Sequence, residues 1–187
     1  SRMNSRWPYY APLIILGILG FYFTAGLGKN PAEVKSVLIN KRVPEFSLPP
    51  IEGNLVGFSS SDLKQQVVLV NIFGSWCVSC QIEHPFLMEL KKTSAIPIYG
   101  INWREPDRTA GPKWLKKYGN PYTKIGDDPK SYGAIAFGVT GAPETFIVDK
   151  TGVIVGMNDF GESAPGDDLQ KHFGFTTKNI LNIINSL

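Results

Sequence analysis

The amino-acid sequence predicts an α/β domain with a mixed central sheet flanked by helices, preceded by one membrane-spanning helix. Short apolar runs typical of buried strands alternate with segments of helical periodicity, which favours parallel strands in the first part of the sheet. Two late strands joined by a tight-turn sequence predict a hairpin, so the sheet also has antiparallel neighbours. An uncharged N-terminal stretch predicts the membrane helix. We therefore expect an anchor at 1–28, a linker at 29–42 and the α/β domain at 43–187.

Charge is unevenly distributed along the 187 residues, whose formal net charge is +3. Residues 1–42 hold six basic side chains and one acidic side chain, whereas the remainder holds 13 basic and 15 acidic ones. A nucleic-acid-binding domain concentrates basic residues on its folded surface. Because the predicted domain is mildly acidic, the charge pattern argues against a nucleic-acid partner.

The stretch from Trp7 to Leu27 contains no charged residue and is 21 residues long. A helix of that length reaches about 30 Å, the thickness of the hydrocarbon core of a bilayer. Arg2 and Arg6 precede it, which favours a cytoplasmic N-terminus and an exported domain. The alternatives are a cleaved signal peptide and a buried core helix, both of which are usually shorter. The polar segment 29–42 is expected to be a tether.

The first elements of the domain follow from hydrophobic periodicity. Residues 46–48 and 55–58 are expected to form a small hairpin, and the run VVLVNIF at 67–73 is typical of a strand buried on both faces. A helix is predicted over 78–92, with a kink at Pro85. The expected apolar face of this helix consists of Ile82, Phe86, Leu87 and Leu90.

The later elements are predicted in the same way. They are a buried strand at 96–102, helices at 109–118 and near 130–136, strands at 145–148 and 153–157 joined by the turn DKTG, and a terminal helix at 176–187. Trp114 and Leu115 are expected on the apolar side of the helix at 109–118.

Cys77 and Cys80 are the only cysteines of the sequence, and they lie in the run WCVSC between the predicted strand and the predicted helix. A cysteine at a helix N-terminus faces unpaired backbone N–H groups and the positive end of the helix dipole, which lowers the pKa of its thiol. Cys80 lies one turn further on, so it can attack a mixed disulfide at Cys77. The pattern predicts a redox pair with Cys77 as the nucleophile.

Other uses of this cysteine pair fit the sequence less well. A structural disulfide that closes so short a loop constrains the unfolded chain little. A zinc site needs further ligands, and the histidines available are His84 and His172. Covalent haem attachment requires Cys-x-x-Cys-His, and residue 81 is Gln.

A second candidate element is the run GAPET at 141–145, in which Pro143 precedes a predicted strand. Such a proline is either a cis turn residue or an ordinary loop residue. Glu83 and Glu144 are candidate proton carriers for a buried thiol, although each taken alone is more typical of a solvated carboxylate. His84 is expected to be a packing or surface residue rather than a base.

Together these motifs resemble the thioredoxin superfamily and, within it, the CcmG/DsbE family of membrane-anchored thiol–disulfide oxidoreductases of cytochrome c maturation. In family order the motifs are VVLVNIFGSWCVSCQIEHPFL, YGINWRE, WLKKYGNPY, FGVTGAPETFIVD and TGVI, within about residues 43–155. The Trp-Cys-x-x-Cys run alone indicates the superfamily. The combination of GNPY with GVTGAPETF indicates this branch of it.

The resemblance implies a thioredoxin-like fold in the periplasm, held to the lipid of the bacterial inner membrane by a single span. It implies that Pro143 is a cis-proline beside the dithiol, that Trp76, Ala142 and Pro143 contact the substrate, and that Glu83 and Glu144 occupy acidic positions of the family. The expected substrate is the haem-binding cysteine pair of apocytochrome c, or another thiol protein of cytochrome c maturation. Electrons are expected from a membrane thiol reductase.

The sequence departs from the family pattern at two places. Val78 and Ser79 lack the proline that is common between the two cysteines, which bears on the reduction potential. Asn71 stands where thioredoxins carry a buried aspartate, so Glu83 or Glu144 must move any proton that a side chain carries.

The predicted function is that of a protein thiol–disulfide oxidoreductase without a cofactor or resident metal. Its reducing direction follows from the resemblance, because a Cys-x-x-Cys pair also serves as an oxidant in some proteins. Two other functions stay open. One is a general extracytoplasmic thiol reductase, and the other is an assembly factor that binds copper or zinc through Cys77, Cys80 and His84.

Overall fold

A computed structural model describes residues 7–27, 38–53 and 56–159 of the chain. The chain divides into two compact units, residues 1–34 and residues 35–187. Within the first unit, helix α1 covers Trp7–Leu27, where a helix is predicted. Its large described apolar side chains are exposed, as Leu16 at 68% and Phe21 at 71% illustrate. Over the residues that the structure describes, no helix has both the length and the hydropathy of a membrane span.

The second unit contains a five-stranded sheet with the strand order β5-β4-β3-β6-β7. The strands are β3 Val68–Phe73, β4 Ile98–Trp103, β5 Lys124–Asp128, β6 Glu144–Val148 and β7 Ile154–Asp159. The central strand β3 runs parallel to β4 and antiparallel to β6. Strand β5 is parallel to β4, and β7 is antiparallel to β6. The predicted mixed sheet and its late hairpin are therefore confirmed.

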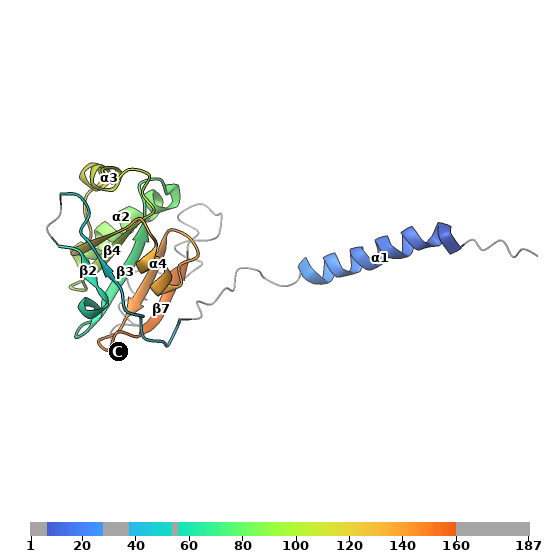
Figure 1. Cartoon of the computed structure of the whole chain (residues 1–187), viewed down its shortest axis with the longest axis horizontal. Helices are drawn as coiled ribbons and strands as arrows, with labels where there is room; N and C mark the ends of the chain where they lie inside the picture. The colour runs from blue at the N-terminus through green and yellow to red at the C-terminus, as the bar shows by residue number, and fades with distance from the viewer. Residues whose placement is uncertain (1–6, 28–37, 54–55, 160–187) are drawn as a thin grey trace, which may run out of the picture. The chain divides into compact units, whose positions relative to one another are not determined.

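Helices cover both faces of this sheet (Figure 1). They are α2 Val78–Thr93, α3 Ala110–Tyr118 and α4 Tyr132–Phe137. Side chains alternate along β3, so Val68, Val70 and Ile72 join one core cluster with residues of α4. Leu69 and Phe73 join a second cluster with residues of α2 and α3. The α2 and α3 helices thus lie on one face and α4 lies on the other, which confirms the prediction that helices flank the sheet.

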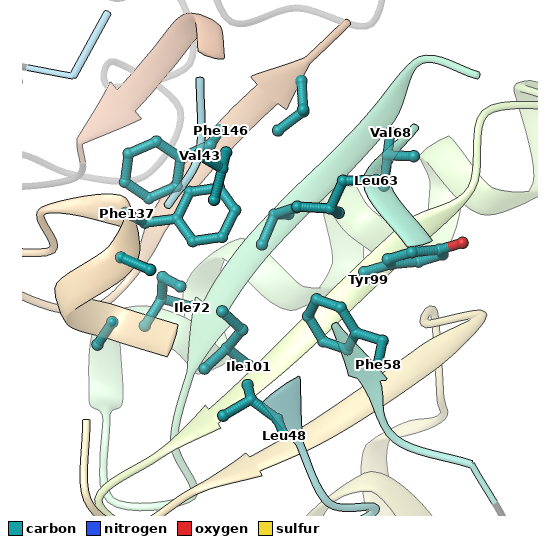
Figure 2. Close-up of a cluster of buried hydrophobic side chains, with 14 of the residues drawn as sticks. Val43, Leu48, Phe58, Leu63, Val68, Ile72, Tyr99, Ile101, Phe137 and Phe146 are labelled. Atoms are coloured by element: carbon teal, nitrogen blue, oxygen red, sulfur yellow. The ribbon is translucent and has the colours of Figure 1, made fainter. Parts of the chain in front are cut away.

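The cluster beneath α4 is rich in aromatic rings (Figure 2). Phe146 of β6 packs against Phe137 of α4, with ring centroids 5.0 Å apart. A small antiparallel sheet formed by β1 Ser47–Leu48 and β2 Phe58–Ser59 adds Leu48 and Phe58 to this core, and the 3-10 turn η1 Ser60–Leu63 adds Leu63. The predicted front hairpin is present, with its second strand later in the chain than expected.

Strand β5 is not among the predicted elements. Its sequence KIGDD contains one large apolar residue, Ile125, and both glycine and aspartate are depleted in strands. Pairing with β4 overrides this low propensity and buries Asp127 and Asp128. The Arg108 guanidinium lies 2.9 Å from the Asp127 carboxylate, and Asp128 Oδ2 accepts a hydrogen bond from the Ala134 backbone N–H at 2.9 Å. Arg108 thus compensates the burial of Asp127, whereas Asp128 Oδ1 has no hydrogen-bond partner among the described residues.

The predicted apolar face of α2 is wrong at one position. The buried residues of the helix are Cys80, Glu83, His84, Leu87 and Leu90. Ile82 is 55% exposed. A pattern based on apolar residues selects Ile82 because it assigns Glu83 and His84 to the solvent side. Pro85 lies inside the helix, and the kink there stays a prediction. The terminal helix expected at 176–187 lies outside the described residues, and the domain boundaries also stay predictions.

Candidate active site

Cys77 and Cys80 lie where β3 ends and α2 begins, at the place that the sequence predicts. Cys77 is the N-cap residue of α2, and its Sγ accepts a hydrogen bond from the backbone N–H of Cys80 at 3.1 Å. The two sulfurs are joined in a disulfide, and both residues are buried, at 4% and 3% exposure. The N–H groups of the first turn and the helix dipole favour negative charge at Sγ once the disulfide is reduced.

Trp76 stands directly before the nucleophile and is 46% exposed. Its Nε1–H donates to the Trp103 carbonyl at 3.0 Å, and its indole lies close over Gly74. A Cβ at Gly74 would lie 2.4 Å from the indole nitrogen, so a side chain there would displace the indole from this position. The ring is thus held in place beside the dithiol while part of its surface stays open to a partner. Contact with a substrate stays a prediction.

A second set of hydrogen bonds to the same loop comes from Glu105, which is not among the predicted site residues. Ser75 donates to its carboxylate from both the backbone N–H and the Oγ hydroxyl, each at 2.6 Å. Arg104, between Trp103 and Glu105, has a positive φ of 50°. Segment 103–105 therefore holds the residues before Cys77 by three hydrogen bonds. The only signal in the sequence is the position of Glu105 in the motif YGINWRE.

Glu83 is buried at 3% exposure, so the expectation of a solvated carboxylate is wrong. It lies one turn after Cys80 on the buried face of α2, and residues three apart on a helix are neighbours. Its Oε1 accepts from Thr145 Oγ1 at 3.2 Å, and its Oε2 accepts from Asn71 Nδ2 at 3.2 Å. Burial raises the pKa of Glu83 to about 7, although both hydrogen bonds oppose the shift. This carboxyl can therefore gain or lose a proton near neutral pH.

Glu144 is also buried, at 1% exposure, which again corrects the expectation of a solvated group. Its Oε1 accepts from the backbone N–H and the hydroxyl of Thr140, at 2.9 and 2.7 Å, and from the Gly141 N–H at 3.0 Å. Because side chains alternate along β6, Glu144 lies on the opposite sheet face from Thr145, which contacts Glu83. The structure does not bring the two glutamates together. Glu144 instead holds the loop that leads to Pro143.

The Ala142–Pro143 peptide bond is cis, which confirms the conformation implied for Pro143. The register pairs Glu144 of β6 with Ile72 of β3, so residues 142–143 lie at the end of the sheet where β3 leads to Cys77. Ala142 is half-buried and packs against the same core cluster as the two cysteines. The structure therefore brings this loop and the dithiol to one edge of the sheet.

His84 is a packing residue, as expected. It is 3% exposed, and its ring lies edge-on to Trp114 with centroids 4.4 Å apart. Its Nε2 is 3.0 Å from the Gly119 carbonyl, which can only accept, so Nε2 carries the hydrogen. Burial lowers the pKa of His84. Among the described residues, no group of three or more His, Cys, Asp or Glu side chains is placed to hold a metal ion.

Because the pKa of Glu83 is raised in the folded state, we expect the contribution of Glu83 to the stability of the oxidised protein to fall as the pH rises. The folded state binds the proton more tightly than the unfolded state, whose pKa is 4.5. The stabilising effect of the protonated form is complete below pH 4.5 and is lost as the pH rises through about 7. Between pH 5 and 8 we expect the contribution to fall by about 2–3 kcal/mol.

Denaturant unfolding of the wild type and of Glu83→Gln across this pH range measures that contribution as a difference. The difference is needed because His84, whose pKa is lowered, has the opposite pH dependence and is present in both proteins. A free energy difference between the two proteins that does not change with pH would contradict the prediction.

Comparison with known proteins identifies relatives across most of the chain. The sequence profile of the Redoxin family matches residues 38–169. The thiol:disulfide interchange protein DsbE of Pseudomonas fluorescens biotype C is 39% identical over 150 residues, covering 80% of this chain and 82% of the relative. The thiol:disulfide interchange protein HelX of Rhodobacter capsulatus is 37% identical over 149 residues, covering 78% and 82%.

Solved structures share the fold at lower identity. A secreted disulfide oxidoreductase of Mycobacterium tuberculosis, described as homologous to Escherichia coli DsbE, aligns with a TM-score of 0.56 at 19% identity. The alignment covers 70% of this chain and 96% of that chain. A DsbF homologue from Corynebacterium diphtheriae aligns with a TM-score of 0.56 at 24% identity, covering 79% and 97%. These likenesses show a thioredoxin-like fold.

Proposed function

Because the chain belongs to the Redoxin family, and within it to the DsbE/HelX thiol:disulfide interchange proteins, it is a protein thiol–disulfide oxidoreductase, and we propose that it reduces the haem-binding cysteine pair of apocytochrome c. The observation that carries the chemistry is the Cys77–Cys80 disulfide at the start of α2, with the buried Glu83 one turn behind it. The substrate is proposed from the motifs GNPY and GVTGAPETF, which resemble those of the cytochrome c maturation branch.

The first step uses the dithiol form of the protein. The Cys77 thiolate attacks one sulfur of the substrate disulfide, forms a mixed disulfide and releases the other substrate sulfur as a thiolate, which takes a proton from water. The Cys80 N–H and the first turn of α2 stabilise the attacking thiolate. Hydrogen bonds from Ser75 to Glu105 and from Trp76 to the Trp103 carbonyl hold the loop before Cys77 in position.

The second step releases the substrate. The Cys80 thiol gives its proton to the Glu83 carboxylate and attacks Cys77 Sγ, which restores the Cys77–Cys80 disulfide and frees the second substrate thiolate. Two electrons have then passed from the protein dithiol to the substrate disulfide. A pKa of about 7 suits Glu83 for this transfer, because it accepts the proton and returns it near neutral pH.

In this proposal the domain lies in the periplasm of a bacterial cell, and residues 7–27 anchor it to the inner membrane. These residues carry no charge and form α1, whose large described apolar side chains are exposed. The anchor is proposed from the sequence, because 21 uncharged residues in a helix reach about 30 Å, the thickness of the hydrocarbon core of a bilayer. A membrane thiol reductase returns two electrons to the Cys77–Cys80 disulfide after each turnover.

The test is a trap made in the full chain. In Cys80→Ala the first step proceeds and the second cannot, so the substrate stays linked to Cys77. Expressed in a bacterium that exports c-type cytochromes, this variant should accumulate a mixed disulfide with apocytochrome c or with another thiol protein of its maturation. Non-reducing electrophoresis and mass spectrometry identify the adduct.

The matched control is the double variant Cys77→Ala/Cys80→Ala, which should carry no adduct. A broad mixture of exported proteins on the trap would support a general thiol reductase and overturn the specific substrate. An absence of any adduct, with the protein exported and folded, would overturn the exchange mechanism at Cys77.

A further inference from the structure

We propose that Tyr122 is a positioning residue for the exchange reaction, because its hydroxyl orients the Asn71 amide so that Asn71 and Thr145 direct their hydrogens at Glu83. This inference rests on the proton-accepting role proposed for Glu83. Among the described residues, no hydrogen bond joins the Tyr122 hydroxyl to the dithiol or to Glu83. Tyr122 acts through Asn71.

Four buried side chains from separate segments form this network. Asn71 comes from β3, Glu83 from α2, Tyr122 from the segment after α3 and Thr145 from β6, with exposures of 1%, 3%, 5% and 1%. The antiparallel register pairs Asn71 directly with Thr145. Tyr122 O–H donates to Asn71 Oδ1 at 2.7 Å, and Asn71 Nδ2 donates to Thr145 Oγ1 at 2.9 Å. Asn71 and Thr145 each donate to Glu83 at 3.2 Å.

The direction of these bonds is fixed by the hydrogens that are present. Because the amide oxygen of Asn71 accepts from Tyr122, the NH₂ group of Asn71 faces the other two residues and uses one hydrogen on each. Thr145 accepts from Asn71, so its own hydroxyl hydrogen is directed to Glu83. Both carboxylate oxygens therefore accept, and the arrangement suits the ionised form of Glu83. A protonated Glu83 can donate to the second lone pair of Thr145 Oγ1, but it finds no acceptor at Asn71 Nδ2.

Loss of the Tyr122 hydroxyl removes the group that fixes the Asn71 amide. The amide is then free to turn and present its oxygen to a protonated Glu83, which holds the proton more tightly. The aromatic ring stays in Tyr122→Phe, where it stacks on Phe73 with centroids 4.7 Å apart. The variant should therefore fold and keep the shape of the site.

The other groups near Glu83 do not supply the same effect. The strands β3 and β6 contribute Asn71 and Thr145, which do not titrate. On α2, the titratable neighbours are the thiols of Cys77 and Cys80 in the reduced protein, together with His84, whose Nε2 contacts the Gly119 carbonyl. Burial first, and then the charge of Glu83, raise the pKa of Tyr122, so its hydroxyl keeps its hydrogen at neutral pH.

The experiment follows Glu83 directly and then follows the reaction. In the full chain in detergent, the side-chain carboxyl of Glu83 is titrated by ¹³C NMR in the oxidised protein, where the cysteines do not titrate. We expect the midpoint in Tyr122→Phe to lie about one pH unit above that of the wild type. Tyr118→Phe is the matched control, because Tyr118 is 41% exposed and should leave the midpoint unchanged.

The same variants are compared in a single turnover of the reduced chain with oxidised glutathione, in which closure of the Cys77–Cys80 disulfide is measured against pH. The pH profile of closure in Tyr122→Phe should shift upward with the NMR midpoint. An unchanged midpoint in Tyr122→Phe overturns the inference. If Glu83→Gln leaves the pH profile of disulfide closure unchanged, the proton-accepting role of Glu83 is overturned instead. The NMR titration still decides whether Tyr122 positions Glu83.

A second variant covers a failure of Tyr122→Phe to fold. Asn71→Ala keeps the Tyr122 hydroxyl and removes the group through which it acts, so the Glu83 midpoint should rise at least as far. The double variant should titrate like Asn71→Ala alone. An unchanged midpoint in Asn71→Ala, or a further rise on adding Tyr122→Phe to it, would overturn the relay.

Discussion

Replacing Cys77 by serine is expected to slow reduction of a protein disulfide by a thousand-fold or more, on the order of the losses caused by removing a catalytic nucleophile. A serine hydroxyl stays protonated at neutral pH, and it forms no disulfide. The first turn of α2, which stabilises a thiolate at this position, has no comparable charge to act on in the variant. The measurement is the rate of insulin disulfide reduction by the pre-reduced full chain.

The companion variant Cys80→Ser separates attack from release. It should form a mixed disulfide with the substrate at a rate near that of the wild type and then stop after one event, since the resolving thiol is absent. Equal loss of the first attack in both variants would mean that the sulfur at the start of α2 is not the nucleophile. Exchange that persists in Cys77→Ser would assign the chemistry to Cys80.

Sequence patterns predicted the parts of the fold that are determined locally. The run from Val68 to Phe73 is apolar at nearly every position because both of its faces are covered, and the cysteine pair follows it at a strand-to-helix junction. The hairpin of β6 and β7 has its own turn sequence. The cis bond at Pro143 was expected from the family motif, and its position beside β3 required the strand register.

Other features depend on contacts between segments that are far apart in the sequence, so no single segment predicts them. Strand β5 is held by β4, despite a sequence that disfavours strands. The contact of Ser75 with Glu105 joins residues 30 apart in sequence, and that of Asn71 with Thr145 joins residues 74 apart. The burial of Glu83 likewise involves distant segments, because its hydrogen-bond partners come from β3 and β6. A charged residue on a helix is therefore assigned to solvent until those partners are known.

Helix α2 provides a direct test of which apolar positions form the core. Leu87 is 2% exposed and belongs to the cluster beneath α2 and α3, so Leu87→Ala should lower the free energy of unfolding by about 2–5 kcal/mol. Ile82 lies on the same helix, yet it is 55% exposed, so Ile82→Ala should change stability by no more than about 0.5 kcal/mol. The measurement is denaturant unfolding of the oxidised protein.

The two substitutions are matched, since each truncates a four-carbon side chain to alanine within one helix. Alanine is the better helix former in both cases, so helix propensity cannot explain a loss at either site. A large loss in Leu87→Ala alone would assign the stabilising contacts of α2 to the face that also carries Cys80 and Glu83. Equal losses would mean that Ile82 is covered in the folded protein, as the apolar pattern of the sequence predicts and contrary to the structure.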